Sequence, residues 1–262
     1  MTTQHFDPSA PAQHILDAWR DGQLMESLPA HIRPESLDQG YEVQEQLFSL
    51  AGGKRAGWKL GVGSPAGMRA AKLSRPLIGQ LEQTRLHGSG VRLQMPSDAP
   101  VTIECEIALV MGRDVSPRLG QEPQGEDFRA TTITFEVVRS RFTDRKSVGW
   151  PTFAADNVGF EALVVGHFIC EGIEEDLVRS LPHSMVVHLD GEPKAKGLFG
   201  DPATDPFQSL AALYAHAAER GYTLKEGDII ATGAMCEPFD LTPSAQQRVS
   251  VKYGGELLEF FI

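Results

Sequence analysis

The chain has 262 residues, 41% of them apolar, which is enough for one large domain with a buried core and at most a small appended lobe. A formal charge of −11, with no run of Lys or Arg, argues against nucleic acid or an anionic membrane surface as the partner, so the expected partner is a small molecule. Three cysteines that lie far apart, with no CxxC pair, argue against a disulfide framework and against a structural zinc site.

The amino-terminal end carries no pattern typical of export. Residues 1–11 contain no basic stretch followed by an apolar run, and no part of the chain reaches 18 consecutive apolar residues. We therefore expect a cytoplasmic protein without a membrane-spanning segment, a location that also fits the unpaired cysteines.

Two amphipathic helices are predicted in the first part of the chain. The first covers residues 9–21, where apolar side chains recur at helical spacing, and it ends at Gly22. The second begins after Ser36, a residue type that caps helix N-termini, and it ends at Gly52 and Gly53. Each helix presents one apolar stripe for packing against a core.

A glycine-rich segment follows and admits two interpretations. Gly61, Gly63 and Ala66 match the dinucleotide-binding fingerprint G-x-G-x-x-[GA], and Glu82 lies about twenty residues further on. That fingerprint requires a clear apolar strand before it and a βαβ unit around it, and the preceding residues offer only a very short strand. The alternative is a short helix capped by Ser64, with glycines that let a backbone or a ligand approach closely.

Lys59 is an unusual residue in its setting, because Trp58, Leu60 and Val62 around it are apolar. A lysine in such a place usually extends its ammonium group into water. A lysine that is partly removed from water can instead titrate low enough to act as an acid or a base. The sequence leaves both interpretations open.

Residues 101–112 predict a strand in which two carboxylates share one face. Alternation divides its side chains into an apolar face of Ile103, Cys105, Ile107 and Leu109 and an opposite face of Thr102, Glu104, Glu106 and Ala108. At positions i and i+2 the two Glu side chains start about 6–7 Å apart, close enough to repel each other and to share a hard cation. The alternative is an ordinary solvated face opposite a core face.

A second predicted strand, over residues 131–138, adds a third carboxylate. Ile133, Phe135 and Val137 occupy one face of this strand, and Glu136 lies on the other among apolar neighbours, where an unpaired charge would be costly to bury. Three carboxylate ligands completed by water suit Mg²⁺ or Mn²⁺. The eight histidines show no pairing at metal-binding spacing, so a histidine site is not expected.

The last third of the chain predicts strands and one helix. Two hairpins are expected, one turning at Asp190-Gly191 and one at Gly254-Gly255, because each follows an apolar strand. Between them, a helix starts at Pro206 and ends at Gly221, and residues 229–231 form a short apolar strand.

Five motifs in this order make the chain resemble a known enzyme family. It is similar to the 2-keto-4-pentenoate (2-hydroxypenta-2,4-dienoate) hydratases and the related 4-oxalocrotonate decarboxylases of the fumarylacetoacetate hydrolase superfamily. The resemblance extends from about Tyr41 to the C-terminus. It rests on G-W-K-L-G from Gly57, I-E-C-E-I-A from Ile103, E-V-V-R-S-R from Glu136, A-D-N from Ala155 and G-D-I-I-A-T-G from Gly227.

The resemblance implies the fold and the site. It implies an α+β chain with a fumarylacetoacetate-hydrolase-like mixed β-roll and packed helices, divided into a mainly helical part over residues 1–75 and a β-rich catalytic part over residues 76–262. It implies a homo-oligomer. The implied site consists of an acid/base lysine, Lys59; the ligands of a divalent metal, Mg²⁺ or Mn²⁺, at Glu104, Glu106 and Glu136; and a substrate pocket at Leu77, Leu81, Asp156, Asn157 and Thr232.

The implied activity is that of a metal-dependent lyase acting on 2-oxo or 2-hydroxy-dienoate carboxylic acids. A hydratase of aromatic-compound degradation is the main expectation, and a decarboxylase or a non-catalytic metal-binding relative are the alternatives. Two positions depart from the hydratases. Leu77 stands where they carry an aspartate thought to help proton transfer, as an aliphatic residue does in the decarboxylases, and Val158 replaces a small polar residue.

Overall fold

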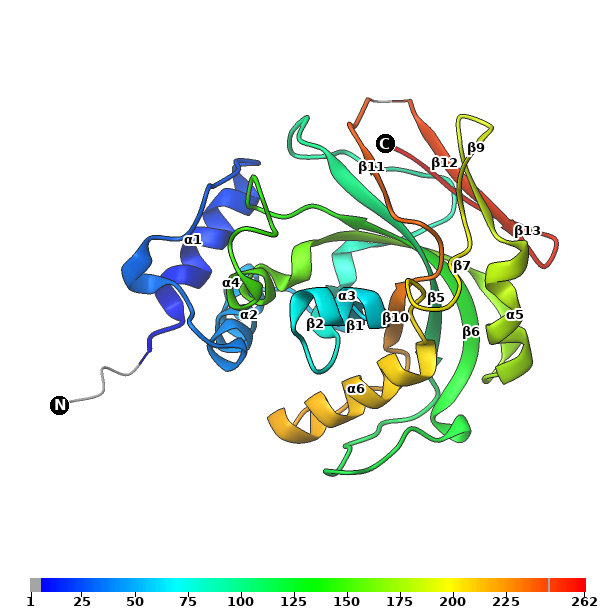
Figure 1. Cartoon of the computed structure of the whole chain (residues 1–262), viewed down its shortest axis with the longest axis horizontal. Helices are drawn as coiled ribbons and strands as arrows, with labels where there is room; N and C mark the ends of the chain where they lie inside the picture. The colour runs from blue at the N-terminus through cyan, green and yellow to red at the C-terminus, as the bar shows by residue number, and fades with distance from the viewer. Residues whose placement is uncertain (1–5, 245) are drawn as a thin grey trace.

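The computed structural model describes residues 6–244 and 246–262, in which a curled eight-stranded sheet and a five-stranded sheet are flanked by helices (Figure 1). Residues 1–5, which belong to the predicted helical part and to the stretch inspected for an export signal, lie outside the described residues. The α-helices are α1 (Ser9–Arg20), α2 (Leu37–Ala51), α3 (Pro65–Ala71), α4 (Trp150–Ala155), α5 (Glu175–Ser184) and α6 (Pro206–Arg220). The 3₁₀ turns are η1 (Ala30–Ile32), η2 (Gln83–Arg85), η3 (Gly125–Asp127) and η4 (Asn157–Gly159).

The predicted helices α1, α2, α3 and α6 are confirmed. Three of them, α2, α3 and α6, begin at a residue whose side chain caps the helix. The Ser36 hydroxyl accepts a hydrogen bond from the backbone of α2, and Gly52 ends that helix in the left-handed conformation. Asp205 and Gly221 play the same parts for α6. The sequence did not predict α4 and α5, because neither carries a side-chain cap and α5 contains a proline.

The large sheet brings strands from the whole chain side by side in the order β2-β1-β10-β5-β6-β7-β3, with β11 paired to one end of β5. Parallel pairing joins β1 to β10 and β3 to β7, and the other pairs in this sheet are antiparallel. Its strands are β1 (Arg55–Gly61), β2 (Leu77–Glu82), β3 (Leu86–Gly88), β5 (Val101–Met111), β6 (Phe128–Val138), β7 (Phe160–Glu171), β10 (Ile229–Ala234) and β11 (Phe239–Leu241). The expected α+β class with a mixed, curled sheet is confirmed.

The second sheet has the order β4-β13-β12-β8-β9 and covers part of the large sheet. Both predicted hairpins are present in it, between β8 and β9 and between β12 and β13. Its strands are β4 (Val91–Arg92), β8 (Val186–Leu189), β9 (Glu192–Lys196), β12 (Arg248–Tyr253) and β13 (Glu256–Phe261).

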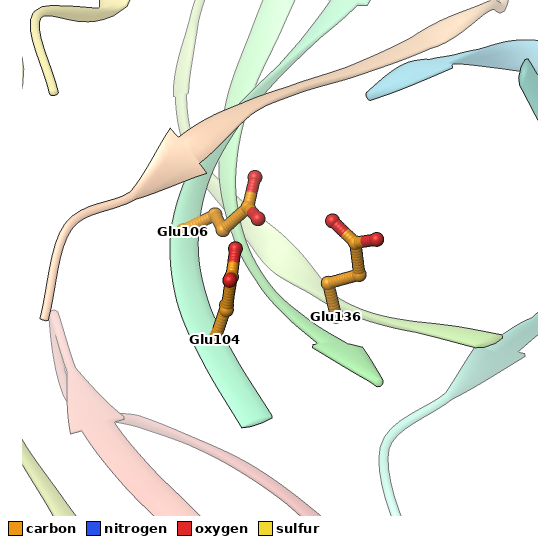
Figure 2. A group of neighbouring side chains, drawn as sticks. All are labelled: Glu104, Glu106 and Glu136. Atoms are coloured by element: carbon orange, nitrogen blue, oxygen red, sulfur yellow. The ribbon is translucent and has the colours of Figure 1, made fainter. Parts of the chain in front are cut away.

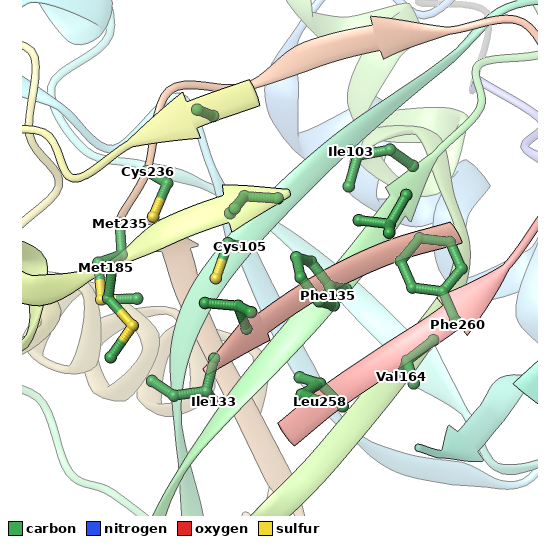
Figure 3. Packing of buried hydrophobic residues seen from close by; sticks show 14 of the residues in the cluster. Ile103, Cys105, Ile133, Phe135, Val164, Met185, Met235, Cys236, Leu258 and Phe260 are labelled. Carbon is green, nitrogen blue, oxygen red and sulfur yellow. The ribbon is translucent and has the colours of Figure 1, made fainter. Parts of the chain in front are cut away.

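The apolar face of β5 forms the core between the two sheets. Ile103, Cys105 and Ile107 are buried there together with apolar side chains of β12 and β13. Figure 3 shows Ile103 and Cys105 in this core with Phe135 of β6 and Phe260 of β13. Leu109, expected on the same face, packs instead in a neighbouring apolar cluster that includes α6. The apolar face of β5 therefore packs in two different apolar clusters along its length. The opposite face of the strand carries Glu104 and Glu106.

The glycine-rich segment after β1 does not form a dinucleotide-binding unit. After α3 the chain returns in β2, which runs antiparallel to β1, whereas the fingerprint belongs to a βαβ unit with parallel strands. The Ser64 hydroxyl caps α3, as the alternative interpretation expected. The division of the chain at residue 75 stays a prediction; β1, which precedes that residue, lies between β2 and β10.

The helices α1 and α2, blue in Figure 1, lie at one end of the molecule beside α4. Their apolar stripes form a separate cluster that includes Trp19, Val43 and Leu47. Among the described helices, none is both long enough and apolar enough to cross a membrane.

Candidate metal centre

The register of β5 and β6 brings the three predicted metal ligands together. Glu104 lies directly opposite Glu136 across the strand pair, and Glu106 follows two residues along the same face. Each can place a carboxylate oxygen so that the three oxygens lie within 4.8 Å of one another (Figure 2). Like charges directly opposite each other on a sheet are destabilising, so this arrangement needs a compensating positive charge.

Burial makes the need for a cation stronger. Glu106 and Glu136 are fully buried, while Glu104 is half-buried. Loss of hydration, followed by repulsion from Glu136 and Glu104, raises the pKa of Glu106 well above its usual value. Loss of hydration also raises the pKa of Glu136, against the opposing attraction of Lys59. A bound divalent cation would remove the repulsion between these two buried carboxylates.

The free lone pairs of the cluster fit such a cation. The backbone N–H of Gly233 donates to Oε2 of Glu106 at 2.8 Å, and Oε1 of Glu136 has the Lys59 ammonium as its ion-pair partner, while Oε1 of Glu106 and Oε2 of Glu136 accept no well-aligned hydrogen bond from the described residues. Buried oxygens without partners are rare in folded proteins because each costs free energy. An all-oxygen donor set of three carboxylates is typical of Mg²⁺, Mn²⁺ or Ca²⁺ and unsuited to softer metals.

Lys59 lies in the same cluster, on β1, the strand next to the edge strand β2. The residue is 1% exposed, so its ammonium group is not extended into water. Nζ lies 2.9 Å from Oε1 of Glu136 and donates a hydrogen bond to the carbonyl oxygen of Val158 at 3.1 Å. The lysine is therefore held beside the carboxylate cluster by one anion and one backbone carbonyl.

The neighbouring strand β2 makes room for the lysine with a glycine. Gly79 pairs with Lys59 across the two strands. A Cβ atom at residue 79 would lie 2.8 Å from Cδ and 3.0 Å from Cγ of Lys59, and 3.0 Å from the carbonyl oxygen of Asn157. The lysine stem thus passes through a gap that only a glycine leaves open.

Replacing Gly79 with alanine is expected to destabilise the fold by about 1–3 kcal/mol, the usual cost of overpacking a filled site. The midpoint of urea unfolding measures the change. Gly88→Ala is the matched control, because that glycine lies on β3 with no atom within 4 Å of the added carbon. Equal midpoints for the two variants would mean that the lysine stem can move aside at no cost.

A cavity of about 450 Å³ opens beside the carboxylates. Lys59 and Glu104 contribute to its wall, and Arg145 and Lys146 are further cations there, from a turn that precedes α4. The remaining wall is mostly apolar: Gly61, Val62, Gly67, Ala70, Ala71, Val138, Trp150, Phe153 and Val158. The sequence interpretation missed Arg145 and Lys146, for which the only signal was two adjacent cations following the S-R motif.

Two valines in this wall have strained backbones. Val62 and Val158 have φ angles of 57° and 53°, in the left-handed region that β-branched residues rarely adopt. Such conformations cost about 1–3 kcal/mol each and concentrate at functional sites. Both residues line the same cavity, which marks it independently of the carboxylates.

The five residues expected in the substrate pocket lie in different places. Leu77 is fully buried against Phe153 and Val158, directly behind the cavity wall. Leu81 packs in another apolar cluster, with Phe160, and Thr232 donates to the carbonyl of Ile107 beside a separate cavity of about 360 Å³.

Asp156 and Asn157 are buried, and their side chains bond to the protein. Asp156 forms an ion pair with Arg141 and accepts a hydrogen bond from Ser140 at 2.8 Å. Burial raises the pKa of Asp156 despite these favourable contacts. Asn157 exchanges two hydrogen bonds with the backbone of Gln80. Neither side chain contributes to the wall of the 450 Å³ cavity.

Comparison with curated proteins finds relatives of two activities. The chain is 27% identical over 198 residues to a 2-keto-4-pentenoate hydratase of Burkholderia vietnamiensis, covering 74% of this chain and 73% of the relative. It is 25% identical over 252 residues to a 4-oxalocrotonate decarboxylase of Pseudomonas sp. strain CF600, covering 94% and 92%. The sequence relatives thus include both enzymes that the five motifs resemble.

Comparison with solved structures supports the fold. A 4-oxalocrotonate decarboxylase from Pseudomonas putida G7, complexed with magnesium and adipate, superposes with a TM-score of 0.81 at 22% identity, covering 97% of this chain and 96% of that one. The profile of the fumarylacetoacetate (FAA) hydrolase C-terminal family matches residues 61–257, a range that contains all three glutamates and begins just after Lys59. With its carboxylate cluster inside the matched range, the chain belongs to the FAA hydrolase C-terminal family.

Proposed function

We propose that this protein is a metal-dependent lyase of 2-oxo or 2-hydroxy-dienoate carboxylic acids, similar to the 2-keto-4-pentenoate hydratases of aromatic-compound degradation. One observation carries the proposal: three carboxylates and a buried lysine meet beside a cavity large enough for a small organic acid. The names of the sequence relatives support the same chemistry.

The chemistry requires charge stabilisation and proton transfer. A divalent cation held by Glu104, Glu106 and Glu136 would supply Lewis-acid stabilisation for negative charge that develops on the oxygens of a 2-oxo acid. Lys59 is the group of this chain that moves the proton, because its Nζ contacts the carboxylate cluster and the residue forms part of the cavity wall. Its hydrogen bond to Val158 and its contact with Glu136 fix where that proton is delivered.

The apolar part of the wall limits access of water. Phe153 and Val158 line the cavity with Leu77 buried behind them, so this side offers a reactive dienol no hydrogen-bonding group except the Val158 backbone. A water-poor wall strengthens electrostatic interactions inside the site and protects reactive species from side reactions.

An ultraviolet assay tests the proposal directly. Purified protein with Mg²⁺ is mixed with a panel of 2-hydroxydienoates and vinylogous 2-oxo diacids, and the products, including CO₂, are identified. We expect metal-dependent loss of dienol absorbance with at least one substrate. Tight Mg²⁺ binding without any turnover would instead identify a non-catalytic metal-binding protein.

A carboxy-lyase acting on a diacid is the second candidate, and the cations of the cavity wall favour it. Arg145 is half-buried and Lys146 is exposed, and neither side chain has an ion-pair partner among the described residues. A guanidinium and an ammonium at the cavity would hold the second carboxylate of a diacid, a group that a monoacid substrate lacks. The aliphatic residue at position 77 also matches the decarboxylase pattern.

Leu77→Asp is expected to raise the ratio of hydration to decarboxylation by about tenfold. General acid–base catalysis contributes about 10²–10⁴-fold, but residue 77 is fully buried, so part of the new acid stays protonated. The measurement is the product ratio of parent and variant at matched metal content. We expect the parent to hydrate slowly, because it has no carboxylate there.

Leu77→Asn is the matched control for this substitution, since it has the same shape and the same burial cost without an ionisable group. A parent that already hydrates fast, with a product ratio that the aspartate leaves unchanged, would show that another group activates the water.

We further infer that the protein works in the cytoplasm as a homo-oligomer. The free cysteines Cys105, Cys170 and Cys236 support a reducing location, and the resemblance to the hydratase and decarboxylase family supports assembly into a homo-oligomer. Sedimentation of the purified chain measures the oligomeric state, and a monomer at micromolar concentration would contradict this inference.

A further inference from the structure

The segment from Asp156 to Gly159 has an unusual backbone. Asn157 and Val158 are consecutive residues with φ angles of 50° and 53°, and neither is a glycine. Asparagine tolerates the left-handed region, but a β-branched residue such as valine seldom adopts it. In this conformation the Val158 carbonyl accepts the hydrogen bond of the Lys59 ammonium, at 3.1 Å.

The Asn157 side chain fixes this segment to β2. Its Oδ1 accepts from the backbone N–H of Gln80 at 2.7 Å, and its Nδ2 donates to the Gln80 carbonyl at 2.8 Å. The amide therefore pairs with both backbone groups of one residue, as a neighbouring strand would. The strand β2 is also hydrogen-bonded to β1, which carries Lys59. The Asn157 amide therefore holds the segment in a fixed position relative to Lys59.

Asp156, the residue before Asn157, is bonded to Arg141, which follows β6 in the chain. Its carboxylate pairs with the Arg141 guanidinium and accepts from the Arg141 N–H at 3.0 Å, and that guanidinium also donates to the Asp156 carbonyl. Both residues are fully buried, and the Arg141 guanidinium lies over the Trp19 ring at 4.7 Å. Strained conformations persist where the surroundings over-determine them, and here two buried contacts do so.

We propose that Asn157 is a positioning residue for Lys59, acting through the carbonyl of Val158, with the Asp156–Arg141 pair holding the other side of the same segment. Both carboxylate oxygens of Asp156, and the oxygen and nitrogen of the Asn157 amide, have protein partners. These two residues thus shape the site without touching the substrate. The proposal rests on the proposed function only in that Lys59 is the group that moves the proton.

Nitrogen NMR of protein labelled with ¹⁵N-lysine tests this positioning without any substrate. A buried, hydrogen-bonded ammonium exchanges slowly with water and gives a separate Nζ resonance, which Lys59→Met identifies by its absence. In Asn157→Ala we expect that resonance to broaden or vanish, because the Val158 carbonyl is released. Asn157→Gly, which keeps the left-handed preference but makes no bond to Gln80, is the gentler variant should the alanine protein fail to fold.

Gln44→Ala is the matched control. The Gln44 amide is also buried and also makes two backbone hydrogen bonds, to the carbonyls of Ile78 on β2 and Ala154 on α4, but its amide is not bonded to Gln80 or to the Val158 carbonyl. We expect it to lower the melting temperature as Asn157→Ala does while leaving the Lys59 resonance unchanged. A general loss of stability would change the Lys59 resonance in both variants alike.

Kinetics supply the second measurement. In Asn157→Ala we expect kcat to fall by about 10²-fold, as for a displacement of a catalytic group by about 1 Å, with KM and Mn²⁺ affinity close to those of the parent. A Lys59 resonance like that of the parent in both Asn157 variants would overturn the proposal. If the resonance broadens or vanishes as expected while the parent turns over no 2-oxo acid, the proposed function fails and the positioning stands.

Discussion

Replacing Lys59 with methionine is expected to lower kcat by about 10²–10⁴-fold, the contribution of a positioned general acid or base. Methionine keeps the length and the apolar stem that pass Gly79 but has no group to move a proton. KM should change little, because Lys59 is expected to act on the transferred proton and not to bind the substrate oxygens. Steady-state kinetics of the metal-saturated variant against the substrate found in the ultraviolet assay measure the effect.

The comparison must use metal-saturated protein. Without metal, removal of Lys59 leaves the buried Glu136 carboxylate without its cation, and breaking such a pair costs about 3–5 kcal/mol. With metal bound, that charge is compensated and the melting temperature should approach that of the parent. Lys54→Met, at an exposed lysine just before β1, is the matched control. A folded, metal-loaded Lys59→Met protein with the kcat of the parent would assign the proton transfer elsewhere.

Replacing Glu106 with glutamine is expected to weaken Mn²⁺ binding by about 10²-fold or more, since loss of a ligand exceeds the 10–100-fold effect of outer-shell changes. The same change should leave the metal-free protein as stable as the parent or more stable. Glu106 is fully buried and repelled by two other carboxylates, and a neutral amide removes both penalties. Opposite effects on metal affinity and on metal-free stability are the signature of a metal ligand.

Titration of Mn²⁺ monitored by electron paramagnetic resonance gives the affinity, and thermal unfolding with and without metal gives the stability. Glu171→Gln, at an exposed glutamate at the end of β7, removes the same charge far from the cluster and should change neither quantity. An unchanged Mn²⁺ affinity in the Glu106 variant would show that the three carboxylates do not form one site.

Local patterns predicted the elements whose ends carry strong signals. The helices α2 and α6 are bounded by a capping side chain at one end and a left-handed glycine at the other, and these contacts need no distant residue. Period-two alternation likewise placed Glu104, Glu106 and Glu136 opposite an apolar face, because side-chain direction in a strand is a local property. Leu109 is the exception, since a curved strand passes from one core to another.

The sequence by itself thus determined three carboxylates on strand faces and a lysine in an apolar strand. Only the tertiary structure decided that they meet, because register between β5 and β6, and the position of β1 beside β10, are set by pairing between distant segments. It also decided the roles of Asp156 and Asn157, whose polar groups are taken up by Arg141 and Gln80. The left-handed backbone of Val158 opposes local preference, and only the contacts of the folded protein can hold it.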